Sequence, residues 1–118
     1  MPTGRPSPSV RDVSINALAV TTTGAQNGVG SDITDSVDYV LEVVNSLNQA
    51  GNIQIQYSVD GGTTWTNLGT PIAAAATTNL FGAITAPRPF FGLVRPVYTA
   101  SIAPTGGTIT LAFHKRYM

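Results

Sequence analysis

Few side chains in this sequence could perform acid–base or nucleophilic chemistry. The chain contains one histidine, no cysteine and six acidic residues. Nucleophilic catalysis needs a base within hydrogen-bonding reach of the nucleophile. The histidine, His114, falls on the outward side of an apolar run, directly before Lys115 and Arg116. We therefore interpret His114 as a surface residue and not as a catalytic base.

The carboxylates could form a glycosidase pair or a calcium site. Glycosidases place two carboxylates about 5–10 Å apart across a sugar, whereas Asp38 and Glu42 share one face of a strand, where we expect both in solvent. Asp32, Asp35 and Asp38 recur at intervals of three residues but lack the alternating oxygen ligands and the glycine of an EF-hand loop. No glycine-rich phosphate-binding motif occurs. The sequence therefore predicts no enzymatic activity, no metal and no cofactor.

The strongest local signal lies at residues 57–66, which read YSVDGGTTWT. An Asp-Gly pair between two alternating runs strongly indicates a β-hairpin, because glycine adopts positive φ without steric cost. Asp60 can accept hydrogen bonds from the backbone N–H groups just ahead of it. Trp65, the single tryptophan, can fold its ring under the turn. We expect a hairpin centred on this stretch.

The composition limits the class of protein. The chain of 118 residues predicts one domain, and only 10% of its residues are charged, six basic and six acidic, so no basic stripe for nucleic acid is present. The absence of cysteine excludes disulfides. No apolar run approaches the roughly 20 residues of a membrane helix, and the N-terminus lacks the apolar segment of a secretory signal. We expect a protein made in a cytoplasm, with a weakly charged surface that suits packing against other proteins.

Alternation and β-branched content indicate the strands that position these residues. Strands are expected over residues 12–22, 37–45, 52–57, 65–68, 90–100 and 108–117. Residues 24–32 predict a Gly/Asn loop. Residues 69–89 favour a short strand followed by a loop, with a single helical turn at the four consecutive alanines as the alternative.

The strand faces follow from the two-residue period. Three rows are expected to be apolar: Val13, Ile15, Ala17 and Ala19; Val37, Tyr39, Leu41 and Val43; and Ile109, Leu111 and Phe113. In the last strand Thr108, Thr110, Ala112 and His114 are expected to face outward. Six to eight short strands with these turn signals predict a single antiparallel β-sandwich, of jelly-roll or Ig-like type.

Two residues of the 90–100 strand carry specific expectations. Pro96 cannot donate to a ladder and therefore marks an edge, a bulge or a break. Arg95 is expected to lay its stem along the sheet, with its head group in solvent or on a carboxylate.

The N-terminal residues differ in character from the rest. Residues 1–10 contain three prolines, which fix φ and disfavour helix in the preceding residue. We expect an extended arm over residues 1–10, ahead of a β-sandwich domain over residues 11–118. The alternatives are a disordered terminus, an arm that lies on its own domain and an arm that binds a neighbouring chain. On the last interpretation, which we favour, the contacting residues are Pro2, Arg5, Pro6, Pro8 and Val10.

The hairpin motif resembles the Asp-box, a Ser-x-Asp-x-Gly-x-Thr-Trp hairpin that recurs in sialidases and many other β-proteins. The matching residues are Ser58, Asp60, Gly62, Thr64 and Trp65. In those families the box is structural and lies away from the catalytic centre. Sialidases repeat it around a propeller, whereas this chain has one copy and is too short for a propeller. The resemblance implies a structural hairpin, with a ligand platform on Trp65 and Tyr57 as the alternative.

The order of three segments resembles small accessory proteins of tailed-phage virions, especially head decoration (cement) proteins. These segments are the hairpin at residues 58–65, the aromatic strand at 90–95 and the Gly-Gly-Thr strand at 106–111, and the likeness covers about residues 35–114. It implies a non-enzymatic structural protein, often trimeric, that binds the major capsid protein and stabilises the capsid surface. No nucleic acid or membrane is implied as a partner.

Two other functions are compatible with the same pattern. One is a structural protein of the phage tail or neck, which differs from a decoration protein mainly in copy number. The other is a carbohydrate-binding module, with Trp65, Tyr57 and Tyr98 as an aromatic platform for a sugar. Exposure of these aromatic side chains distinguishes the second alternative from a structural role.

Overall fold

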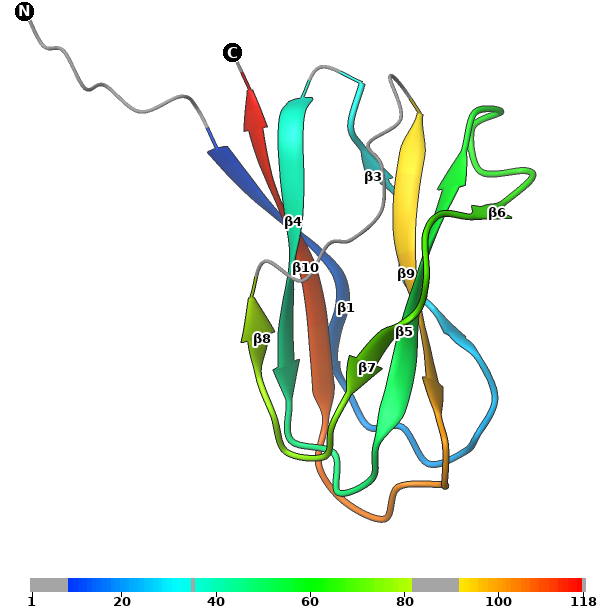
Figure 1. Ribbon diagram of the computed structural model, residues 1–118, viewed down its shortest axis with the longest axis vertical. Helices are drawn as coiled ribbons and strands as arrows, with labels where there is room; N and C mark the ends of the chain where they lie inside the picture. Colours follow the sequence, from blue (N-terminus) through cyan, green and yellow to red (C-terminus); the bar gives the residue numbers. More distant parts are fainter. Residues whose placement is uncertain (1–8, 35, 82–91, 118) are drawn as a thin grey trace, which may run out of the picture.

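The protein is an all-β sandwich of two antiparallel sheets (Figure 1). The computed structural model describes residues 9–34, 36–81 and 92–117. The strands are β1 (Ser9–Leu18), β2 (Gln26–Asn27), β3 (Ser31–Asp32), β4 (Ser36–Asn45), β5 (Gly51–Ser58), β6 (Thr66–Asn67), β7 (Ile72–Ala74), β8 (Leu80–Phe81), β9 (Leu93–Ala100) and β10 (Ile109–Tyr117). No helix in these ranges is long and apolar enough to cross a membrane.

The two sheets draw their strands from all parts of the chain. The first sheet has the order β1-β10-β4-β8, and the second has the order β2-β9-β5-β6, with β3 also paired to β9 and β7 to β5. The chain crosses between the layers repeatedly (Figure 1), so that β4 and β5, although consecutive, lie in opposite sheets. β10 lies between β1 and β4 and pairs with both over almost its whole length. The antiparallel sandwich expected from the strand pattern is confirmed.

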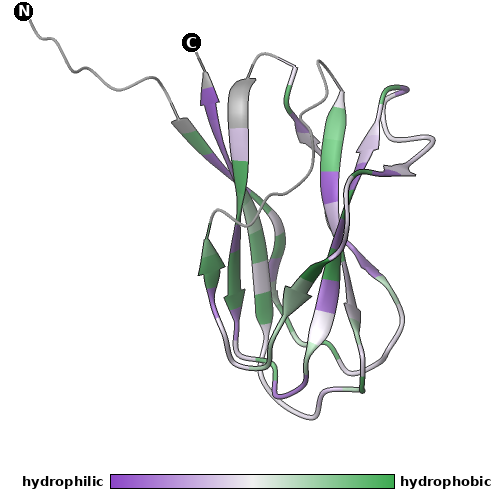
Figure 2. Cartoon of the chain, viewed as in Figure 1, coloured by the Kyte–Doolittle hydropathy of each residue, from purple (hydrophilic) through white to green (hydrophobic). Residues whose placement is uncertain are grey.

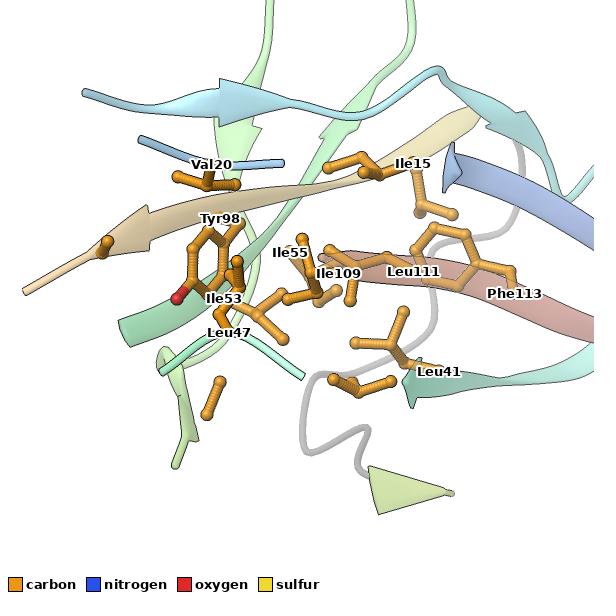
Figure 3. Packing of buried hydrophobic residues seen from close by; sticks show 14 of the residues in the cluster. Ile15, Val20, Leu41, Leu47, Ile53, Ile55, Tyr98, Ile109, Leu111 and Phe113 are labelled. Carbon is orange, nitrogen blue, oxygen red and sulfur yellow. The ribbon is translucent and has the colours of Figure 1, made fainter. Parts of the chain in front are cut away.

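The core lies between the sheets and is formed by alternate residues of the long strands. Hydrophobic and hydrophilic residues alternate along β5 (Figure 2). The largest fully buried side chains include Leu41, Leu47, Ile53, Ile55, Tyr98, Ile109, Leu111 and Phe113, which pack against one another between the layers (Figure 3). The inward row expected for β10 is confirmed. Ala112 faces outward but is also covered, because side chains from β1 and β4 cross above it.

Pro96 lies inside β9, at a break in the ladder that β9 forms with β3 and β2. β3 pairs with β9 at residues 93–94 and β2 pairs at residues 97–98, so neither strand requires an N–H from Pro96. Between them the backbone nitrogen of Gly28 donates to the carbonyl of Pro96 at 2.8 Å. A Cβ at Gly28 would come within 2.8 Å of the Pro96 ring, so a glycine is needed for this close approach. Pro96, which has no N–H, therefore lies at the point where the strand bordering β9 changes from β3 to β2.

The expected alternation of the first strand holds to Ile15 and is wrong beyond it. Register shifts between residues 13 and 18 mark β-bulges, and Ala17 adopts a φ of 46°. Its backbone nitrogen donates to Oγ1 of Thr110 at 2.9 Å. Ile15 is buried, whereas Ala17 and Ala19 are exposed, and the strand ends at Leu18 and not at residue 22. The bulge moves the small residues out of the core row.

Two connecting regions differ in part from expectation. The loop expected over residues 24–32 contains β2 and β3, two short strands that cover the edge of β9. Residues 72–74 form β7, which confirms the short strand expected there, and β8 follows at residues 80–81 without a helical turn at the alanines. At the N-terminus β1 begins at Ser9, so Val10 belongs to the strand, where it pairs with Lys115. The remainder of the expected arm lies outside the described residues.

A buried lysine joins the two sheets at one end of the core. Lys115 continues the inward row of β10 and is only 6% exposed. Its Nζ donates to Oδ2 of Asp12 at 3.2 Å, on β1, and to the carbonyl of Asp32 at 2.9 Å, on β3. Oγ of Ser31 also donates to Oδ2 of Asp12 at 2.5 Å. Both sheets therefore contribute to the hydrogen bonds of one ammonium group.

We expect Asp12→Ala to destabilise the fold by about 1–3 kcal/mol, because it leaves a buried ammonium group with one partner fewer. Lys115→Met replaces the charge with an apolar side chain of similar length and should cost less than about 1 kcal/mol. Urea unfolding of both variants and the wild type measures the difference. A larger loss for Lys115→Met than for Asp12→Ala would contradict this account of the site.

Candidate functional site

The Asp-box motif forms a closed hydrogen-bonded turn between β5 and β6. Oδ1 of Asp60 accepts from the backbone nitrogens of Thr63 and Thr64 at 3.1 and 2.9 Å. Oγ of Ser58 donates to the same Oδ1 at 2.7 Å and accepts from the nitrogen of Gly62 at 2.9 Å. The hairpin expected from the sequence is confirmed, and two side chains organise its backbone.

Both glycines of the turn adopt conformations that other residues rarely reach. Gly61 has a φ of 78° and Gly62 a φ of 97°. Hydrogen bonds from the backbone of Thr64 and the side chain of Ser58 lower the pKa of Asp60 to about 2, because they favour the charged carboxylate. At neutral pH the turn therefore holds an ionised aspartate as its acceptor.

Trp65 lies on the outer face of the second sheet, where it packs against Arg95. Nε1 of Trp65 donates to the carbonyl of Gly62 at 3.0 Å, and the guanidinium carbon of Arg95 lies 4.2 Å from the centre of the indole ring. A Cβ at Gly30 would come within 3.1 Å of Cη2 of the indole. The ring is thus half-buried under its turn, as expected, and an arginine covers it.

Arg95 interacts with an amide and not with the carboxylate or solvent that the sequence suggested. Its Nε and Nη2 both donate to Oε1 of Gln56, at 3.0 and 2.9 Å. Gln56 lies directly opposite Arg95 in the ladder and donates in turn to Oδ1 of Asn67 at 2.9 Å. Burial lowers the pKa of Arg95 from its usual value. An outward polar row therefore crosses β9, β5 and β6.

The three aromatic residues considered for a sugar platform are not brought together. Tyr98 is fully buried in the core, where burial raises the pKa of its hydroxyl group. Tyr57 packs against the same core from its edge. Trp65 lies on the opposite face of the sheet. The three-residue platform is wrong, because Tyr57 and Tyr98 belong to the inward row of their strands.

A second polar cluster crosses the outer face of the first sheet. Nε of Arg11, on β1, donates to Oε1 of Glu42, on β4, at 2.9 Å. Nε2 of His114, on the intervening β10, lies 2.6 Å from the same oxygen, and because a carboxylate only accepts, this nitrogen carries the proton. Phe81, on β8, meets the His114 ring edge to face at 5.1 Å. The four residues link all four strands of the sheet.

Hydrogen bonds lower the pKa of Glu42 to about 2, because they favour the charged carboxylate. The largest contribution comes from Arg11 and the next from His114. His114 faces outward, as expected, and it is a partner of Glu42. The expectation that Glu42 points into solvent is wrong, since its side chain is only 20% exposed. The bond to Glu42 likewise raises the pKa of Arg11. At neutral pH the cluster is a structural ion pair.

The cluster borders a hollow of about 490 Å³ on the outer face of this sheet. The described residues that line it are Arg11, Glu42, Val43, Val44, Asn79, Leu80, Phe81 and His114. They include no serine, threonine or cysteine that His114 could activate. The arrangement is suited to binding through hydrogen bonds and apolar contact.

The remaining candidate residues form no common site. Hydrogen bonds from the side chain and backbone of Thr34 lower the pKa of Asp32. Asp35 lies outside the described residues, and within the described ranges no three acidic, histidine or cysteine side chains are grouped to hold a metal ion. Val10 is exposed at the start of β1. Pro2, Arg5, Pro6 and Pro8 also lie outside the described part of the chain.

The sequence did not predict the cluster of Arg11, Glu42 and His114. Alternation places Glu42 and His114 outward, but their contact depends on the register between strands about 70 residues apart. Comparisons with protein-family models, with curated proteins and with solved structures returned no match. The two outward clusters are therefore interpreted from their own geometry.

The contact between Arg95 and Trp65 can be tested by fluorescence, because Trp65 is the single tryptophan. Arg95→Ala should expose the indole to water, shift its emission maximum to longer wavelength and increase quenching by acrylamide. Thr99→Ala, an exposed position on the outer face of the same strand, is the matched control. Equal spectra for wild type and Arg95→Ala would show that the arginine does not cover the ring.

The lowered pKa values of Glu42 and Asp60 predict that the free energy of unfolding falls in acid. Glu42 and Asp60 have pKa values of about 2 in the folded protein, below their ordinary values of 4.5 and 3.8. Because the folded state binds fewer protons, their stabilisation is present above about pH 4.5 and is lost as the pH falls towards 2. We expect Glu42→Gln and Asp60→Asn each to reduce the pH dependence of the urea midpoint between pH 6 and pH 2.5, and the double variant to reduce it further. An unchanged pH dependence in the double variant would contradict both assignments.

Proposed function

We propose that this protein is a non-enzymatic structural protein of a phage virion. It binds the outside of the capsid through the major capsid protein, stabilises the head as a decoration or cement protein, and assembles as a homotrimer. The proposal combines the likeness in the order of sequence segments with the geometry of the sandwich.

The observation that carries the proposal is the position at which β1 begins. Ser9 opens β1 at the edge of the first sheet, paired with Arg116 near the end of β10. Residues 1–8 therefore precede an edge strand. An extended segment can add to the sheet edge of a neighbour, where main-chain hydrogen bonds provide affinity. Many copies on a lattice would make even weak contacts effective through multivalency.

The internal polar networks support a role in which the domain stays rigid. The Asp-box turn fixes one end of β5, and the cluster around Glu42 spans four strands of the opposite sheet. A close-packed sandwich resists deformation, which suits a protein that stabilises a shell.

A carbohydrate-binding module is the second candidate, and it now depends on Trp65 alone. The indole is half-buried on an outer face with the Arg95 guanidinium over one side of its ring, so only the remaining exposed part of the ring could contact a sugar. A structural protein of the tail or neck is the third.

Mass spectrometry and a cryo-EM map of virions purified from the phage that encodes this sequence test the proposal. Hundreds of copies on the head surface would support decoration. A few copies at the tail or neck would replace it with the tail role. Absence from the virion would reject both, and a glycan-array screen would then test the second candidate.

We expect deletion of residues 2–8 to leave the free energy of unfolding within about 1 kcal/mol of the full chain, because β1 begins at Ser9. Binding to particles stripped of the protein should fall at least tenfold in a co-sedimentation assay, since the arm contacts are removed. A chain with a Gly/Ser segment of equal length at residues 2–8 separates the effect of the native side chains from that of length. Full binding by the deletion variant would reject the arm as a binding element.

A further inference from the structure

The hollow on the first sheet has an apolar side that is open to solvent. Phe81 is 68% exposed and Val44 is 43% exposed, and Leu80 lies beside them. Exposed apolar side chains that form a contiguous patch, in contrast to single ones, are typical of interaction sites. The edge-to-face contact with His114 holds the Phe81 ring in place. A partner that packs on this ring would therefore lose little side-chain entropy in ordering it.

The opposite side of the hollow presents hydrogen-bond donors. The guanidinium of Arg11 has five N–H groups, and two of them point at Glu42, at 2.9 and 3.5 Å, so three remain. Asn79 accepts from the nitrogen of Asn45 through its Oδ1, which identifies the other terminal atom as an NH2 donor. No partner for this NH2 group occurs among the described residues.

The acceptors of the hollow are already used. Oε1 of Glu42 accepts from Arg11 and from His114, and Oε2 faces the second nitrogen of Arg11. Oδ1 of Asn79 is bonded to the backbone. A ligand that brought further donors would find few free lone pairs, whereas a ligand that brings acceptors would find several donors.

We propose that this hollow binds a segment of a partner protein in which an apolar side chain stands next to a carboxylate. The apolar side chain packs on Phe81 and Val44. The carboxylate accepts from the free N–H groups of Arg11 and from the amide of Asn79. Because Arg11 and His114 already bond to Glu42, the incoming carboxylate meets donors and not an unpaired anion.

The openness of the hollow favours a protein segment over a small molecule. Small-molecule sites enclose about 70–90% of their ligand, whereas this hollow lies on the outer face of a sheet and its main apolar contact, Phe81, is largely exposed. The proposal does not rest on a virion role.

Two matched dipeptides test the site on the full chain labelled with nitrogen-15. Acetyl-Leu-Asp-amide should shift the amide NMR signals of Arg11, Glu42, Phe81 and His114 with a dissociation constant in the millimolar range, as expected for a ligand of this size. Acetyl-Leu-Asn-amide, which lacks the charge, should bind about five- to tenfold more weakly. Acetyl-Gly-Asp-amide, which lacks the apolar side chain, should also bind more weakly.

Two variants test whether the dipeptide binds through the proposed contacts. Phe81→Ser and Arg11→Gln should each weaken acetyl-Leu-Asp-amide at least fivefold while the dispersion of the spectrum stays that of the folded wild type. Ile102→Ser is the matched control, because Ile102 is also exposed, at 62%, but lies in the turn between β9 and β10.

Several results would overturn the proposal. These are equal affinity for the Asp and Asn dipeptides, shifts confined to other surfaces, and no binding at millimolar concentration. Sedimentation of the wild type and Phe81→Ser gives a further test. If Phe81→Ser dissociates an oligomer, a second copy of the chain occupies the hollow and the proposed partner segment is wrong.

Discussion

Burial of the two inward rows between the sheets is the constraint on which the rest of this structure depends. The chain has no cysteine and no helix in its described ranges, so apolar side chains from both layers must exclude water from one shared core. Neither sheet can bury its inward face alone. Because the inward positions are committed to packing, the polar clusters described above lie on an outer face, at the turn or at the end of the core.

That division explains how the few charges of the molecule are used. Each of the four carboxylates whose side chains are described accepts hydrogen bonds from within the chain: Asp12, Asp32, Glu42 and Asp60. Most of these bonds fix a turn or connect strands that are distant in sequence. The outer surface is therefore polar through amides and hydroxyls more than through free charge. Long-range electrostatic steering contributes little to association with such a surface, and short-range fit must provide the specificity.

The parts of this fold that depend on short-range sequence patterns could be predicted from the sequence. A two-residue period identified β4, β5 and β10 and the inward row of β10, and an apolar run identified β9. The Asp-Gly-Gly turn identified the hairpin with its aspartate acceptor. The bulge at Ala17 was not foreseeable, because an alanine at positive φ has no distinctive composition. The cluster at Glu42 and the inward lysine at residue 115 depend on register between strands that are distant in sequence. Tyr98 was wrongly expected to be exposed, because tyrosine occurs on both the buried and the exposed faces of strands.

The central position of β10 has a consequence for biosynthesis. β1 and β4 do not pair with each other; both pair with β10, which is synthesised about 65 residues after β4. Until β10 emerges from the ribosome, β1 and β4 have apolar rows without their shared neighbour, and such exposed strands favour aggregation and degradation. A chain that stops before residue 109 cannot form the first sheet. Translation errors that truncate the chain should therefore yield products that aggregate or are degraded.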